Sequence, residues 1–325
     1  MQSAGEISHI ALLNYPGAQQ AAVLGLSDLL VTAARLQGDG RLAVSLWDSL
    51  QAGEWAKGQD QRDAEPASPF TALVLPPSLD GGAWQDEGDA WPDWIKARHA
   101  EGSLVCSVCA GSFLLAETGL LTGRRATTHW GLADRFAHAY PEVSLAIDEM
   151  VVDEGDVVTA GGLMAWVDLG LRLVGRFLGP ETLQQTARYF LVDPGGREQR
   201  YYSRFAPRLD HGDIAILKVQ HRLQPDSSLS VAEMSALAGL GERTFLRRFQ
   251  RATGLRPTAY LQQLRVARAC DLLEGSRSSV GQIAWQVGYE DSGAFSKIFQ
   301  RLMGLTPGDY RRRFTVEPYS DMSLR

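Results

Sequence analysis

The segment VCSVCAGSF, residues 105–113, holds the side chain of this sequence that is best suited to covalent chemistry. A short apolar run ends at Cys109, and a helical pattern over residues 111–121 begins two positions later. This order predicts a thiol on a sharp strand-to-helix turn, where several enzyme families place a nucleophile. Amide N–H groups at the start of the following helix would lower the pKa of such a thiol from about 8.5 and favour the thiolate.

The remaining cysteines and histidines indicate no metal or redox site. Cys106 forms a C-x-x-C pattern with Cys109, but it lies inside the apolar run and is expected to be buried as a small hydrophobic residue. The histidines other than His129 show no metal-ligand spacing, and we predict neither a metal nor a cofactor. Asp168, inside an otherwise apolar helical segment, is predicted to be a paired carboxylate.

Strand and helix patterns alternate through the first 180 residues. The expected strands are 7–14, 42–49, 71–77, 103–108 and 157–162, and the expected helices are 18–36, 91–102, 111–121 and 163–179. Strands that are continuously apolar, with helices between them, indicate a parallel sheet covered on both faces. The predicted fold class is therefore an α/β doubly wound parallel sheet of the flavodoxin-like type, with its site at the carboxyl ends of the strands.

The turn at Cys109, together with the sequence ATTHW, resembles the DJ-1/PfpI group of glutamine-amidotransferase-like domains. The resemblance implies that His129 lies near the cysteine. Members with chemistry on this fold usually carry an acidic side chain near the first helix, whereas no Asp or Glu occurs here between Glu6 and Asp28. The loop after the third expected strand reads Pro76-Pro77, and proline has no N–H to donate to an oxyanion. We therefore predict no catalytic residue.

The turn then becomes a candidate binding site rather than a reaction centre. The resemblance implies that the N-terminal part of the chain binds a small molecule over the cysteine. The predicted ligand-pocket residues are Cys109, Ala110, Pro77, His129, Trp130 and Gly162.

Length and charge indicate two domains with different partners. The 325 residues carry a net charge of −6, but residues 1–213 contribute −12 and residues 214–325 contribute +6. A basic C-terminal part joined to an acidic body indicates nucleic acid as the partner of the C-terminal part. No apolar run approaches the ~20 residues of a membrane span, and we see no secretory signal pattern. With only three cysteines, the chain is expected to be cytoplasmic and not to contact a membrane.

An internal repeat dominates residues 230–310. Phe245 and Phe249 of the first copy correspond to Phe295 and Phe299 of the second, and a tyrosine closes each copy. In both copies a serine precedes a short amphipathic pattern that ends at glycine, and a second helical pattern follows. This is the anatomy of two helix-turn-helix units, joined by a long helix.

The second copy, IAWQVGYEDSGAFSKIFQRLMGLTPGDYR, resembles the AraC/XylS-type DNA-binding domain nearly position by position. The second helix of each copy has polar or basic side chains opposite its aromatic face, as a reader of the major groove requires. The predicted DNA-binding residues are Arg243, Thr244, Leu246, Arg247, Arg251, Ser292, Gly293, Ser296 and Lys297. Arg248 and Arg251 are expected to contact phosphates or to remain solvated.

Together the two parts resemble the GlxA-type group of transcriptional regulators. The predicted regions are a ligand-sensing and dimerisation domain at 1–192, a linker at 193–213, a DNA-binding domain at 214–317 and a tail at 318–325. The boundary rests on the Pro, Gly and Arg content of the linker.

The predicted function is a sequence-specific regulator, an activator in preference to a repressor, that binds double-stranded promoter DNA. The resemblance implies a small effector, often nitrogen-containing, a homodimer formed through the N-terminal domain, and RNA polymerase as a further candidate partner. Two alternatives stay open. One is a cysteine-dependent amidase or hydratase with an attached DNA-binding module. The other is a regulator whose signal is oxidation of Cys109.

Overall fold

The computed structural model describes residues 7–49, 55–57, 70–79, 90–225 and 229–315, and the chain divides into two compact units that meet between Gln199 and Arg200. The predicted tail at 318–325 lies outside the described residues. The predicted domain limits stay a prediction.

The N-terminal unit is built on one large sheet and a small separate strand pair. In the described part of the chain, the large sheet has the strand order β3-β2-β1-β4-β5-β9-β8, in which the five central strands are parallel and the two edge strands are antiparallel. Its strands are β1 (Ser8–Asn14), β2 (Leu42–Ser49), β3 (Trp55–Lys57), β4 (Ala72–Leu75), β5 (Leu104–Val108), β8 (Val151–Asp153) and β9 (Val157–Ala160), and the separate pair is β6 (Arg125–Ala126) with β7 (Ser144–Leu145). The predicted doubly wound parallel sheet is confirmed.

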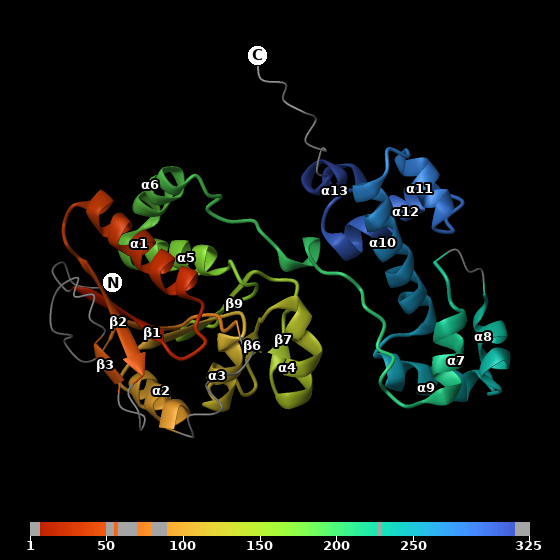
Figure 1. The fold of residues 1–325 in the computed structure, drawn as a ribbon, viewed down its shortest axis with the longest axis horizontal. Helices are drawn as coiled ribbons and strands as arrows, with labels where there is room; N and C mark the ends of the chain where they lie inside the picture. Colours follow the sequence, from red (N-terminus) through yellow and green to blue (C-terminus); the bar gives the residue numbers. More distant parts are fainter. Residues whose placement is uncertain (1–6, 50–54, 58–69, 80–89, 226–228, 316–325) are drawn as a thin grey trace, which may run out of the picture. The chain divides into compact units, whose positions relative to one another are not determined.

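Helices cover both faces of the large sheet (Figure 1). They are α1 (Gln20–Gln37), α5 (Trp166–Leu178) and α6 (Pro180–Phe190) on one face, and α2 (Ala90–Ala100) and α3 (Gly111–Glu117) on the other, with α4 (Ala133–Ala139) beside α3. Because both faces are covered, β4 and β5 are buried along their whole length, which explains their continuous apolar sequence. The helices α4 and α6 were not expected from the sequence.

The C-terminal unit is helical and follows the repeat. Its helices are α7 (Ile214–Arg222), α8 (Val231–Ala238), α9 (Glu242–Thr253), α10 (Pro257–Gly275), α11 (Val280–Gln286), α12 (Ser292–Met303) and α13 (Pro307–Phe314). The serine caps are present as capping boxes, Ser230 with Glu233 and Ser279 with Gln282. Each copy has its own apolar core, and α10 joins the two copies (Figure 1).

A close approach of two backbones fixes the start of α3. A Cβ atom on Gly111 would lie 2.7 Å from the carbonyl oxygens of Leu75 and Pro76, a distance that real Cβ atoms do not reach. The turn after β5 therefore packs directly on the end of β4, and only glycine fits between them.

Replacing this glycine should destabilise the N-terminal unit. We expect Gly111→Ala to lower the free energy of unfolding by about 1–3 kcal/mol, because the added methyl group forces the two backbones apart. Urea unfolding followed by circular dichroism measures the effect. Gly195→Ala is the matched control, since a Cβ there meets no atom within 4 Å and its φ is not positive, and it should change stability by less than about 0.5 kcal/mol. Equal midpoints for the two variants would contradict the close-approach argument.

Candidate functional site

Cys109 lies directly after β5 in a backbone conformation that non-glycine residues rarely adopt. Its φ is 54°, in the left-handed region. Two hydrogen bonds hold it there: its N–H donates to the carbonyl of Ala160 (2.8 Å), and its carbonyl accepts from Thr128 Oγ1 (2.8 Å). The sharp strand-to-helix turn expected around Cys109 is therefore present, and we call residues 108–111 the elbow.

The electrostatics of the elbow differ from the sequence-based expectation. Burial raises the pKa of the Cys109 thiol to about 11, and the backbone N–H of Ala110 lowers it only in part. The expected lowering was wrong because the desolvation of the thiolate outweighs the few amides that α3 offers. Cys106 is fully buried, as predicted, and burial also raises the pKa of its thiol.

The loop beside the elbow presents carbonyl groups rather than N–H groups. The buried Tyr15 hydroxyl donates to the carbonyl of Pro76, and the N–H of Gln19 donates to the carbonyl of Pro77 (2.8 Å). Burial, together with the nearby Cys109, raises the pKa of Tyr15. An oxyanion at this loop would face carbonyl oxygens and two prolines without N–H groups, which destabilises an anion.

The predicted pocket residues follow neighbouring strands of the sheet. Pro77, Cys109 and Gly162 come after β4, β5 and β9, which are adjacent and parallel, so these residues lie at the same edge. His129 and Trp130 are half-buried after β6, with ring centroids 5.3 Å apart. His129 Nδ1 accepts from the N–H of Gly131 (3.0 Å), and burial lowers the pKa of this histidine.

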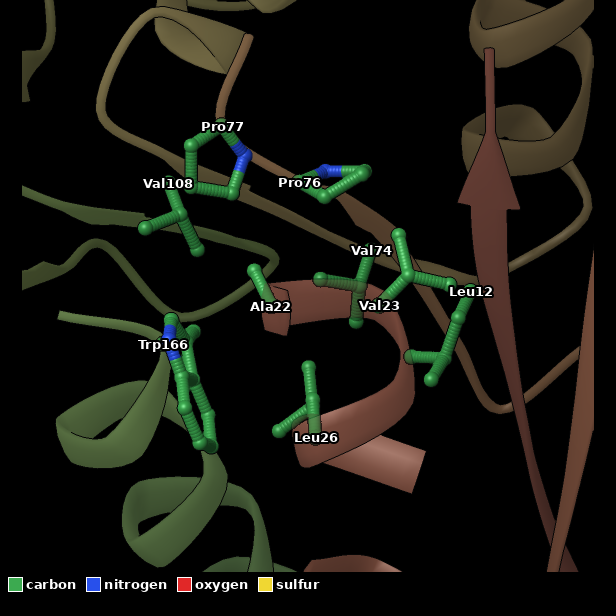
Figure 2. Close-up of a pocket in the computed structure, with 9 residues that line it drawn as sticks. All are labelled: Leu12, Ala22, Val23, Leu26, Val74, Pro76, Pro77, Val108 and Trp166. Carbon is green, nitrogen blue, oxygen red and sulfur yellow. The ribbon is translucent and has the colours of Figure 1, made fainter. Parts of the chain in front are cut away.

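An apolar cavity of about 10 Å³ opens beside the elbow, between α1 and the start of α5 (Figure 2). Its lining residues are Leu12, Ala22, Val23, Leu26, Val74, Pro76, Pro77, Val108 and Trp166. Of the six predicted pocket residues, the lining includes Pro77. The membership of Cys109 and of the other four in a ligand pocket stays a prediction.

Three buried polar atoms near this end of the sheet have no hydrogen-bond partner among the described residues. They are Trp166 Nε1, Gln19 Oε1 and Ser78 Oγ. Trp166 lines the cavity with its carbon atoms, because the cavity surface is entirely apolar, and its indole N–H is buried away from that surface. The ring itself is fixed, because its benzene edge packs on Gly25, where a Cβ would lie 2.6 Å from Trp166.

The paired carboxylate expected at Asp168 is confirmed. Arg197 donates to both of its carboxylate oxygens, with a distance of 3.0 Å from Nε to Oδ1. Among the described residues no group of His, Cys, Asp and Glu has the arrangement of a metal site. In the same part of the chain, no helix is long and apolar enough to cross a membrane.

The second helix of the first repeat, α9, buries its aromatic side and exposes its basic side. Phe245 and Phe249 are completely buried. All five predicted DNA-binding residues of this helix are exposed: Arg243, Thr244, Leu246, Arg247 and Arg251. The three arginines of this set, Arg243, Arg247 and Arg251, form no ion pair with a carboxylate in the described part of the chain. Arg248 is different, because it donates to both carboxylate oxygens of Asp213 (2.9 and 2.7 Å).

The corresponding helix of the second repeat, α12, has the same two sides. Phe295 and Phe299 are buried, whereas Ser292, Gly293 and Lys297 are exposed. Asp291 caps the helix by accepting from the N–H of Gly293 (2.8 Å). Ser296 is half-buried and donates its hydroxyl to the carbonyl of Ser292 (2.8 Å) within the helix. Each repeat therefore presents one exposed polar helix face with cationic side chains.

Comparison with known proteins agrees with both units. The DJ-1/PfpI family model matches residues 53–176, and a helix-turn-helix domain model matches residues 234–313. The transcriptional regulator CdhR of Pseudomonas aeruginosa is 26% identical over 71% of this chain and 66% of its own length. The regulator GlxA of Rhizobium meliloti is 29% identical over 65% of this chain and 66% of its own length. An isonitrile hydratase of Pseudomonas putida is 30% identical over 54% of this chain and 74% of its own length.

These matches define the class of protein. The chain joins a domain of the DJ-1/PfpI family to an AraC-type helix-turn-helix domain. This combination, with GlxA and CdhR among its relatives, matches a GlxA-type regulator. The alignments with CdhR and GlxA cover slightly less than two thirds of those proteins.

Sequence reasoning missed Gln199, which is 2% exposed and lies behind the segment that follows β6. Its side chain bonds to Thr127, to the carbonyls of Thr128 and Glu149, and to the N–H of Trp130. A lone glutamine in a polar stretch carries no signal of burial, so the sequence offered no way to find it.

The raised pKa of the Cys109 thiol predicts slow alkylation at neutral pH. Because the thiol ionises near pH 11, the rate of reaction with iodoacetamide should rise about tenfold for each pH unit between 7 and 10. Mass spectrometry of the Cys109 peptide after timed quenching measures the rate. The fully buried Cys106 serves as the internal control and should react more slowly at every pH. A rate that levels off near pH 7 would show a stabilised thiolate and contradict the prediction.

Proposed function

We propose that this protein is a sequence-specific DNA-binding transcriptional regulator whose N-terminal unit binds a small molecule. The observation that carries the proposal is the duplicated helix-turn-helix, in which α9 and α12 each bury two phenylalanines and expose polar and cationic residues. Such a helix fits the major groove, where side chains read base edges. The names of CdhR and GlxA support the same function.

The tandem units imply a bipartite DNA site. Helix-turn-helix units on one face of the duplex read elements one helical turn apart, about 10–10.5 base pairs. A homodimer formed through the N-terminal units would read a second such pair. We favour activation over repression, with RNA polymerase as a further partner, and we place the protein in the cytoplasm with the DNA.

The effector site is proposed to lie over the elbow and its neighbouring cavity. The lining of the cavity is apolar throughout, and its volume of about 10 Å³ has room for roughly one water-sized group. An effector over the elbow would therefore place at most a small apolar group in this cavity and lie mainly outside it. In line with the resemblance to the GlxA-type group, we propose a nitrogen-containing effector.

Enzyme activity is not part of the proposal. The buried, protonated thiol of Cys109 and the carbonyl-lined loop lack the activated nucleophile and the oxyanion donors that hydrolysis or hydration requires. Burial and a raised pKa also disfavour oxidation of Cys109 as the regulatory signal.

Substitutions on α9 and α12, which we call the two recognition helices, should weaken DNA binding. We expect Arg247→Ala and Lys297→Ala each to cost about 1–3 kcal/mol on a site selected from random duplexes by the full chain, and to relax preference at one position. Fluorescence anisotropy measures the affinity. The control is Arg268→Ala, an exposed residue of α10 outside both recognition helices, which should leave affinity within twofold. Equal losses on selected and random DNA would assign the two residues to phosphate contacts.

Isonitrile hydration should be absent. Because an isonitrile hydratase is 30% identical over 54% of this chain, the full chain should be assayed with an isonitrile substrate beside its Cys109→Ser variant. We expect the same background rate for both, measured by chromatography of the formamide product. Turnover that depends on Cys109 would overturn the non-enzymatic assignment.

A further inference from the structure

The residues on either side of the boundary between the two units make specific contacts, each within its own unit. We call residues 199–213 the strap. Its first residue, Gln199, belongs to the N-terminal unit, and from Arg200 onward the strap belongs to the C-terminal unit. The boundary falls within one short 3-10 helix, η3 (Gln199–Tyr201).

The first residue of the strap is anchored behind the elbow. Gln199 Nε2 donates to Thr127 Oγ1 (2.9 Å), to the carbonyl of Thr128 (2.8 Å) and to that of Glu149 (3.1 Å), while its Oε1 accepts from the N–H of Trp130 (3.1 Å). The same Thr128 donates its hydroxyl to the carbonyl of Cys109. Gln199 is therefore separated from the elbow by one residue.

The side-chain amide of Gln199 packs closely against the backbone of Gly161. A Cβ on Gly161 would lie 1.8 Å from Gln199 Nε2, so the amide packs directly on the backbone of the β9–α5 turn. Any displacement of the segment around Thr128 or of the Gly161 turn must move Gln199 or break its hydrogen bonds.

The next residues of the strap are fixed at the end of the second recognition helix. Gly304 ends α12, and a Cβ there would lie 2.4 Å from Arg200 Nε and 2.6 Å from Tyr201 Cε1. Tyr202 follows, and its hydroxyl accepts from Arg313 (3.0 Å) of α13. This part of the strap therefore contacts the second repeat.

Two successive strap residues then contact equivalent tyrosines of the two repeats. Arg204 donates to the hydroxyl of Tyr310 and pairs with Glu274 in the second repeat. Phe205 packs edge-on against Tyr260 of the first repeat, with ring centroids 5.2 Å apart and planes at 88°. The strap thus crosses from one copy to the other at this point.

The last residues of the strap hold the first recognition helix. Asp213 caps α7 and receives both hydrogen bonds from Arg248 of α9, which keep the pKa of its carboxyl below the ordinary value. The carbonyl of Arg208 accepts from Gln220 (2.9 Å), which also donates to the Tyr260 hydroxyl (3.1 Å). Both recognition helices are therefore tied to one segment.

We propose that the strap is a positioning element for DNA reading, which sets the separation of the two recognition helices and couples it to the elbow through Gln199. The proposal rests on the DNA-binding function proposed above. The helix α10 contributes side chains to both cores and joins the copies, and the strap adds a second tie through Arg204 and Phe205 that limits bending and twisting between them. Because coupling is reciprocal, DNA binding must in turn change the surroundings of Gln199.

The first experiment tests the positioning role with the full chain. Duplexes selected by the wild-type chain are lengthened by one base pair between their two elements, which rotates one element by about a tenth of a turn. We expect the wild type to lose at least about tenfold in affinity. Arg204→Ala should bind the original duplex more weakly and lose less than threefold on lengthening.

The controls separate positioning from folding. Arg208→Ala removes an exposed strap arginine whose side chain makes only a 3.7 Å ion pair with Asp210, and it should behave as wild type. If Arg204→Ala does not fold, Phe205→Leu tests the same tie through the first repeat. A variant that weakens both duplexes equally, with the lengthening penalty intact, would overturn the positioning role. A wild-type chain that selects no duplex would instead refute the DNA-binding function.

The second experiment tests the coupling through Gln199. Hydrogen exchange is followed by mass spectrometry on the full chain with and without its selected duplex. We expect DNA to slow or accelerate exchange in residues 127–131 by at least about threefold in the wild type, because the N–H of Trp130 bonds to Gln199. In Gln199→Ala this change should disappear, while protection of α9 and α12 by DNA persists. If the exchange rates of residues 127–131 in the wild type do not change when DNA binds, the coupling is overturned.

Discussion

A buried primary amide must satisfy two N–H groups and a carbonyl oxygen, and Gln199 imposes this requirement on the N-terminal unit. Its partners come from the segment after β6, from the residues before β8, and, by packing, from the turn after β9. The amide bridges these segments behind Cys109. Each partner left unpaired in the interior would cost roughly 1–3 kcal/mol. The last residue of the unit is thus linked to the elbow through Thr128, which bonds to both.

Competition between desolvation and local dipoles decides the chemistry of the elbow. The turn has the strained backbone of a nucleophile elbow, with the φ of Cys109 at 54°. Its thiol is nonetheless buried, and the seven-residue helix α3 provides too little stabilisation to offset the loss of water. Geometry and reactivity are separate properties here. A domain can have the backbone turn of a nucleophile elbow and use it only to shape a binding surface.

The sequence predicted the features that depend on local or repeated patterns. It did not predict single contacts between residues that are far apart in the chain. The helix-turn-helix pair followed from aromatic residues such as Phe245 and Phe249, whose spacing recurs in the second copy. The sheet followed from its apolar strands. Gln199 could not be predicted, because its hydrogen-bond partners lie 50 to 72 residues away and its neighbours in sequence are polar. The cavity was missed for the same reason, since its walls come from five separate elements and share only Pro77 with the predicted pocket.

The two closing tyrosines occupy equivalent positions in the repeat but have different hydrogen-bond partners. The ring of each tyrosine packs on the second phenylalanine of its own copy, but the Tyr260 hydroxyl meets the neutral amide of Gln220, whereas that of Tyr310 lies between Arg204 and Glu274. These partners lie outside both copies, in α7, in the strap and at the end of α10. The asymmetry of the C-terminal unit at the two tyrosines therefore comes from the segments that flank the copies, which give each equivalent hydroxyl a different electrostatic environment.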